Sequence, residues 1–181
     1  MSDTLKPYTL ITDFVTGREI PNIGAEENRQ AVEQFLVNAK GYSKDDIATD
    51  VKIEMMVAGK PYSSQVDLVV TVGPAKKRIM VFKCAAGSLG SREREIVAAA
   101  RLLDDYQIPL AVVSDGKTAI VLDTISGKKI GEGMDAVPSK DAVTRNLDSY
   151  RFAAFPRERQ EREKLIFRTY DSENVNVQRN L

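Results

Sequence analysis

Two charged residues stand where the sequence otherwise predicts apolar strands. Asp67 interrupts a valine-rich run, and Lys83 interrupts a second apolar run that follows a short turn. If that turn centres on Ala75, an antiparallel register sets Asp67 opposite Lys83 and pairs Val69 with Val81. The sequence therefore predicts that an acid and an amine meet on one face of a sheet.

A second carboxylate, Glu27, is predicted to join this pair. It lies four residues before Ala31, so it continues the expected inner face of a helix at its N-terminal end. Two carboxylates and a lysine suit magnesium-dependent phosphodiester hydrolysis. The carboxylates hold the hard cation, the metal activates a water, and the lysine orients that water or stabilises developing charge. The alternative is structural: an Asp67–Lys83 ion pair that only holds the hairpin together.

Composition excludes several other chemistries. The chain of 181 residues has no histidine and one cysteine, Cys84. This excludes histidine-based nucleophile systems, imidazole metal ligands, an internal disulfide and a cysteine-based zinc site. No apolar run approaches membrane-spanning length, and residues 1–8 lack a signal-peptide core. We therefore expect a cytoplasmic protein without a membrane partner.

Charge is balanced overall and uneven locally. There are 26 basic and 26 acidic residues, so no global attraction to nucleic acid is implied. Residues 76–101 nevertheless carry seven basic side chains against two acidic ones. This local excess is where we expect contact with DNA.

The segment after the Lys83 strand resembles a phosphate-binding loop. Residues 87–91 read Gly-Ser-Leu-Gly-Ser and lead into a predicted helix, whose N-terminus favours an anion. Two arginines lie in its first turn, and Arg94 and Arg101 are predicted to share an outward stripe that follows a nucleic-acid backbone. The residues expected to contact phosphate or DNA are Ser88, Ser91, Arg92, Arg94 and Arg101. The alternative is an ordinary strand-to-helix connection with a solvated arginine face.

The periodicity of apolar residues predicts the elements that position these side chains. In chain order, these are a helix over 25–40, strands over 51–57, 65–72 and 78–84, a helix over 91–106, and strands over 108–114 and 118–122. This order predicts an α/β fold with a central mixed β-sheet flanked by helices. We place one nuclease-like domain at 1–155 and a charged, solvated C-terminal helical tail at 156–181.

In their order, these motifs resemble the N-terminal nuclease domain of type I restriction enzyme R (motor) subunits, within the PD-(D/E)xK nuclease superfamily. The resemblance covers residues 26–122. It rests on Glu26-Glu27-Asn28-Arg29-Gln30, Gly41-Tyr42, Val66-Asp67-Leu68-Val69-Val70 and Val81-Phe82-Lys83. It implies a restriction-endonuclease-like fold, Mg²⁺ as cofactor, DNA as substrate and restriction-modification subunits as partners. By this resemblance Asp67 and Glu27 are metal-site carboxylates, and Lys83 is the catalytic lysine.

One position departs from the family pattern. The acid-x-lysine motif requires a carboxylate two residues before Lys83, where this chain has Val81. Glu27 or Glu54 would have to supply the missing oxygen. Three functions therefore stay open. One is a magnesium-dependent DNA endonuclease, and another is a catalytically degenerate nuclease-fold module that binds DNA or a protein partner. The third is a structural or regulatory partner domain with the charged tail 157–181 as its contact.

Overall fold

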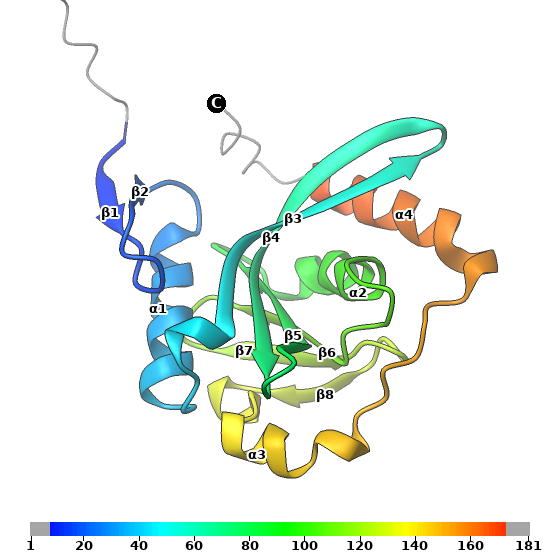
Figure 1. The fold of residues 1–181 in the computed structure, drawn as a ribbon. Helices are drawn as coiled ribbons and strands as arrows, with labels where there is room; N and C mark the ends of the chain where they lie inside the picture. The colour runs from blue at the N-terminus through cyan, green and yellow to red at the C-terminus, as the bar shows by residue number, and fades with distance from the viewer. Residues whose placement is uncertain (1–7, 173–181) are drawn as a thin grey trace, which may run out of the picture.

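Helices cover both faces of a mixed β-sheet in the computed structural model, which describes residues 8–172 (Figure 1). The strand order in this six-stranded sheet is β3-β4-β5-β6-β7-β8, and β1 and β2 form a separate two-stranded sheet. The strands are β1 (Leu10–Thr12), β2 (Glu19–Pro21), β3 (Ile47–Val57), β4 (Lys60–Val72), β5 (Lys77–Cys84), β6 (Leu110–Ser114), β7 (Ala119–Asp123) and β8 (Lys129–Glu132). The α-helices are α1 (Glu26–Asn38), α2 (Glu93–Leu102), α3 (Lys140–Arg145) and α4 (Arg157–Ser172).

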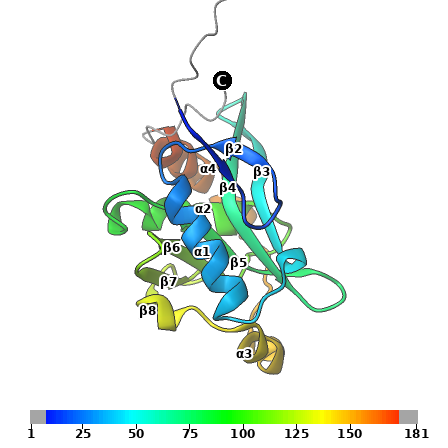
Figure 2. The same cartoon turned by 90° about the vertical axis from the view of Figure 1, so that its left-hand side faces the viewer.

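The two faces of the sheet have separate apolar cores. Val32 and Leu36 of α1 pack on one face with Phe82 and Cys84 of β5. On the other face, α2 packs on a second core that contains Val81. Because side chains alternate along a strand, β5 supplies both cores. Figure 2 shows α1 and α2 on either side of the sheet. The predicted α/β class with a central mixed sheet is confirmed.

The register of the central hairpin is also confirmed. Strands β4 and β5 are antiparallel, with Val69 opposite Val81, and the last pair toward the N-terminal end of β4 is Leu68 with Phe82. The predicted pairing of Asp67 with Lys83 is the next step of this register, but the paired residues end before it. Strand β5 pairs with β6 in parallel, which makes the sheet mixed.

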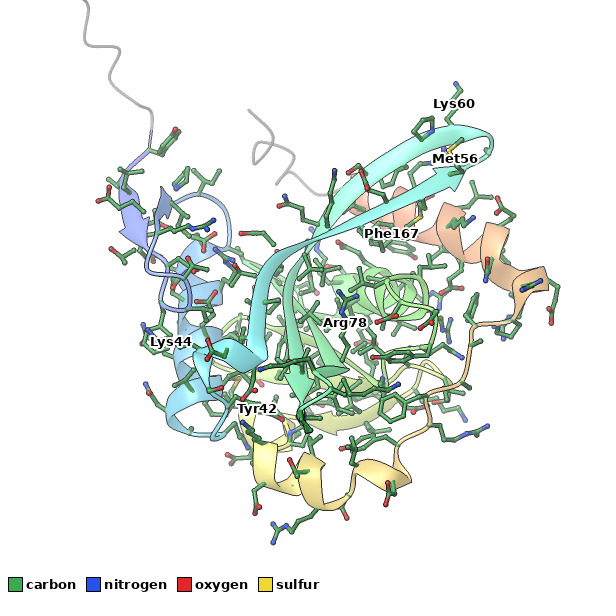
Figure 3. All side chains as sticks on the ribbon, in the orientation of Figure 1. Tyr42, Lys44, Met56, Lys60, Arg78 and Phe167 are labelled. Carbon is green, nitrogen blue, oxygen red and sulfur yellow. The ribbon has the colours of Figure 1, made fainter. Side chains whose placement is uncertain are left out.

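Strand β4 leaves β5 at Asp67 and continues with β3 alone. The β3–β4 pairing runs from Ile47 opposite Val70 to Val57 opposite Lys60, well beyond the pairing with β5. The two strands thus form an arm that extends from the sheet over α4 (Figure 3). The ring of Phe167 on α4 lies edge-on to Tyr62 of the arm, with centroids 6.3 Å apart. We call the point at which β4 separates from β5 the branch.

Strand β8 and the two ends of the described chain differ from the expectation. The β1–β2 hairpin was not predicted, since its strands are three residues long and carry no clear alternation. Helix α4 occupies the predicted tail but is not wholly solvated, because Glu163 and Phe167 are buried. Residues 173–181 of that tail lie outside the described residues. Within 8–172, no helix combines the length and the apolar character needed to cross a membrane.

The β6–β7 turn touches α1 at Gly116, and this contact can be tested. Gly116 has a φ of +84°, and a Cβ there would lie 2.8 Å from the Cβ of Ala31. We expect Gly116→Ala to lower the free energy of unfolding by about 3 kcal/mol, measured by urea denaturation, from backbone strain and overpacking together. Gly41→Ala is the matched control: φ is +76° and the space is open, so a loss of about 1 kcal/mol is expected. Equal losses in the two variants would contradict the close approach.

Candidate active site at the branch

Asp67 joins the two strands where they separate. Its side chain is buried, and the backbone amide of Cys84 donates a hydrogen bond to Asp67 Oδ2 at 2.7 Å. This bond lies just past the last β4–β5 pair, so the carboxylate takes over the role of a backbone acceptor in the ladder. A buried carboxylate bound to a backbone amide contributes about 1.5–3 kcal/mol to stability.

Lys83 lies on the α2 side of the sheet and is held by an acid that the sequence did not reveal. Its Nζ is 3.1 Å from Glu95 Oε1 on α2, and both side chains are nearly buried. Arg92 Nη1 lies 3.7 Å from the other oxygen of Glu95. Burial opposes the charge of Lys83, but Asp67, Glu95 and Asp171 outweigh it and raise the pKa of the ammonium. Asp67 thus acts on the charge of Lys83, but the ion-pair partner of Lys83 is Glu95 and not the predicted Asp67.

Neither face of β5 presents an acid two residues before a lysine. On the α2 side, Val81 precedes Lys83 and is fully buried in the apolar core. On the α1 side, the corresponding two positions are Phe82 and Cys84, both buried in the other core. The departure seen at Val81 therefore has no remedy elsewhere on this strand.

The helix carboxylate Glu27 does not reach the branch, and its predicted place on the inner face of α1 is wrong. Glu27 and Ala31 are both exposed, and Glu27 accepts a hydrogen bond of 2.9 Å from Asn22 Nδ2. The inner face at this end of α1 is polar, so apolar periodicity could not locate it. Glu54 is no substitute, since it is exposed and forms an ion pair with Lys52.

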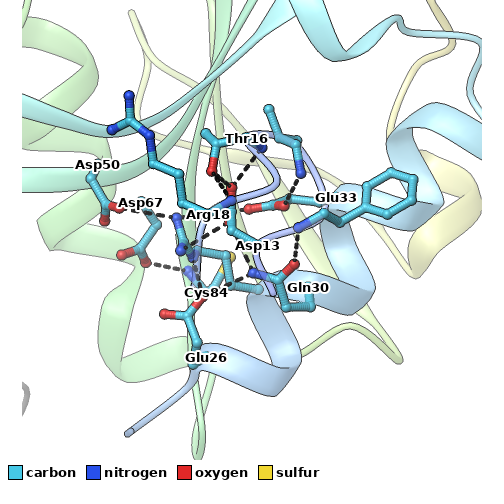
Figure 4. Close-up of polar contacts among 12 residues, drawn as sticks. Asp13, Thr16, Arg18, Glu26, Gln30, Glu33, Asp50, Asp67 and Cys84 are labelled. Atoms are coloured by element: carbon cyan, nitrogen blue, oxygen red, sulfur yellow. Dashed lines mark hydrogen bonds and ion pairs between the residues drawn. The ribbon is translucent and has the colours of Figure 1, made fainter. Parts of the chain in front are cut away.

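The buried face of α1 instead carries an ion network centred on Arg29. Figure 4 labels the four carboxylates of this network, Asp13, Glu26, Glu33 and Asp50. The guanidinium is almost completely buried, and its Nε lies 2.6 Å from Glu26 Oε1. Its other carboxylate neighbours are Asp13 at 3.2 Å, Asp50 at 3.3 Å and Glu33 at 3.7 Å. Asp50 directly precedes Val51, the register partner of Val66, so the network extends to the branch. Glu26 and Arg29 carry the resemblance, but no pattern in the sequence predicts this network.

The proposed DNA-contact residues divide into two groups. Ser88, Ser91 and Arg94 are exposed, whereas Arg92 is engaged with Glu95. Arg101 is buried, and the prediction that it lies on an outward stripe is wrong. The physical reason is that α4 covers this face of α2. Arg101 Nη1 lies 2.9 Å from Glu163 Oε1, and its Nε donates to the carbonyl of Thr124 at 3.0 Å.

The residues at the branch do not fit a magnesium site. Asp67 accepts the amide of Cys84, Glu95 is held between two cations, and Val81 offers no oxygen. The predicted ligand Glu27 is engaged elsewhere, on the surface. Across residues 8–172, no group of three or more acidic, cysteine or histidine side chains is arranged to hold a metal ion.

A pocket of about 460 Å³ lies away from the branch, at the opposite end of β5. It is lined by residues 72–75 of the β4–β5 turn, Lys77, and the aromatic rings of Tyr150 and Phe152 among others. None of the predicted catalytic, metal or phosphate residues lines it. The sequence-derived site and this pocket are therefore separate features.

Comparison with known proteins decides the family. Residues 24–138 match the family described as Type I restriction enzyme R protein N terminus, which is well over half of the chain. The chain belongs to this family. The matched span contains α1, the branch, the Lys83–Glu95 pair and the six-stranded sheet. The β1–β2 hairpin precedes the residues that match the R protein N-terminus family, and α4 follows them. No curated protein and no solved structure matches the chain.

Proposed function

We propose that this protein is a catalytically silent nuclease-fold module of the R protein N-terminus family, which acts by binding restriction-modification subunits. The observation that carries this proposal is the absence of a carboxylate from the position on β5 where the nuclease motif requires one. Val81 stands where a nuclease of the implied type needs a carboxylate and is buried in one apolar core, while its neighbour Phe82 is buried in the other. The nearby polar residues Asp67 and Lys83 make structural contacts instead, with the backbone and with Glu95.

The chemistry of the branch supports this proposal. Water activation at a phosphodiester needs a cation held by free carboxylate oxygens, with an amine beside it. Here the amine of Lys83 is neutralised by Glu95, and Asp67 bonds the backbone. The first turn of α2 also carries two acids, Glu93 and Glu95, which disfavour a phosphate at that helix end. For these reasons, and because the net charge is zero, we favour a protein partner over DNA.

Cleavage of supercoiled plasmid with Mg²⁺ or Mn²⁺ tests the claim that the protein has no nuclease activity. We expect no metal-dependent nicking above the level given by Asp67→Ala. The proposal would be contradicted if the wild-type protein nicked the plasmid, if Asp67→Ala and Lys83→Ala abolished this activity, and if the control Lys60→Ala on the arm kept it. Co-purification with restriction-modification subunits encoded in the same genome tests the claim that the protein binds these subunits.

One observation favours a second candidate, a magnesium-dependent endonuclease in which Glu95 replaces the missing acid. The Glu95 carboxylate lies beside Lys83, and Asp67 is within electrostatic reach of the same amine. In that case Glu95→Gln would abolish nicking, whereas Glu93→Gln, in the same helical turn, would leave it intact. Nicking that Glu95→Gln retains would exclude Glu95 as the replacement acid, and the absence of nicking in the wild-type protein would leave the silent module as the function.

A further inference from the structure

The N-terminal hairpin is fastened to α1 by hydrogen bonds from its loop. The Phe14 amide donates to Gln30 Oε1 at 2.6 Å, and the Val15 amide donates to Glu33 Oε2 at 3.1 Å. Gln30 Nε2 in turn donates to Asp13 Oδ1 at 3.0 Å. The side chain of Val15 packs against the core on the α1 side. The hairpin loop thus depends on side chains of α1 for its backbone partners.

Four carboxylates surround a single buried guanidinium at this interface. Arg29 is the buried cation, and the carboxylates of Asp13 and Glu33 are as deeply buried as its guanidinium. The charged groups that face them are Asp13 from the hairpin, Glu26, Arg29 and Glu33 from α1, and Asp50 from β3. Lys44, from the 3-10 turn η1 (Lys44–Asp46), is exposed and lies over the ring of Phe14. Four carboxylates around one buried guanidinium favour uptake of a proton, because like charges and burial both disfavour the ionised form of a carboxyl.

Glu33 is the group that takes the proton. Its Oε1 is buried without a hydrogen-bond partner, and Glu33 and Asp13 both contact the same guanidinium, that of Arg29. Two carboxylates both accept, so only a proton would let one of them donate a hydrogen bond to the other. Burial and then the charge of Asp13 raise the pKa of Glu33 to about 8. For Asp13, hydrogen bonds from Thr16 and Gln30 outweigh burial and lower the pKa.

We propose that Asp13 and Glu33 share one proton, and that its loss loosens the hairpin loop from α1, so that the two form a pH-sensitive latch. With both groups ionised, Asp13 and Glu33 repel each other across the interface, and the loop that carries the Val15 amide moves away. The latch goes beyond the binding role proposed above and does not depend on it.

Amide NMR and trypsin cleavage between pH 6 and 9.5 test the latch in the full chain. We expect the Val15 amide shift to titrate near pH 8. Cleavage after the exposed Arg18, relative to cleavage after Arg157 of the same molecule, should rise about tenfold between pH 7 and 9, in step with the ionised fraction. The ratio cancels the pH dependence of trypsin itself. In Glu33→Gln both readouts should stay flat, while Glu19→Gln, on the exposed hairpin strand, should behave as wild type.

Thermal unfolding gives a second readout with a fixed sign. A folded pKa of about 8 for Glu33 lies above the unfolded value of about 4.5, so its contribution to stability is full below pH 4.5 and is lost as pH rises through 8. The Tm of Glu33→Gln relative to wild type should therefore rise from pH 5 to pH 9. Either of two results would overturn the proposal. One is a Val15 amide shift that does not titrate in the wild-type protein, and the other is a Val15 titration that is unchanged in Glu33→Gln.

Discussion

Replacing Arg29 with alanine is expected to lower the free energy of unfolding by about 3–5 kcal/mol. The substitution removes the buried cation and leaves Asp13, Glu26 and Glu33 without it. Although burial opposes the charge, Asp50 and Glu26 raise the pKa of Arg29, so the guanidinium stays charged at every pH of interest. Truncating one member of such a network leaves several desolvated charges unpaired, which is why the loss is large.

Urea denaturation at pH 7 measures this loss, with Arg18→Ala as the control. Arg18 is an exposed arginine of the hairpin close to the same network, so its removal should change stability by about 0.5 kcal/mol or less. A loss below about 1 kcal/mol in Arg29→Ala would show that the network is not what holds α1 and the hairpin together.

The second large effect is expected at Arg101. Arg101→Ala should cost about 3–4 kcal/mol, because it leaves the buried Glu163 carboxylate unpaired and removes donors from the carbonyls of Thr124 and Ile125. Thermal and urea unfolding give the stability. A fluorescence assay with a short DNA duplex gives the affinity of the folded variant, which should equal that of the wild-type protein.

Arg94→Ala provides the comparison on the same helix. Arg94 is exposed, so stability should change by about 0.5 kcal/mol or less. If Arg101→Ala proved as stable as Arg94→Ala but lost DNA affinity, then Arg101 would act on nucleic acid and the position of α4 over α2 would be in error.

The sequence predicted the fold where apolar alternation was strong. The valine-rich β4 and the apolar β5 were found with the correct register. The irregularity between Val70 and Thr71 shifts only the pairs nearest the turn. Asp67 and Lys83 were visible because each breaks an apolar run. Pattern reasoning of this kind depends on a residue that contrasts with its neighbours along the strand.

The misses have a common physical origin. Apolar spacing predicts Glu27 on the inner face of the helix, whereas this end of α1 buries charge around Arg29. The pattern along α2 predicts an exposed Arg101, because the helix that covers it begins far along the chain, at Arg157. Glu95 looks like an ordinary first-turn acid. In each case the decisive contact is with a residue far away in the sequence, so the periodicity of apolar residues along one element cannot predict it.

The central claim is that the branch at Asp67 is a structural junction and not a metal centre. The most direct test adds substoichiometric Mn²⁺ to ¹⁵N-labelled protein and follows the amide signals of residues 66–68 and 82–85. We predict that these signals keep their intensity, with the Cys84 amide still bonded to Asp67. Selective broadening at these amides that Asp67→Asn abolishes would contradict the account and return the branch to nuclease chemistry.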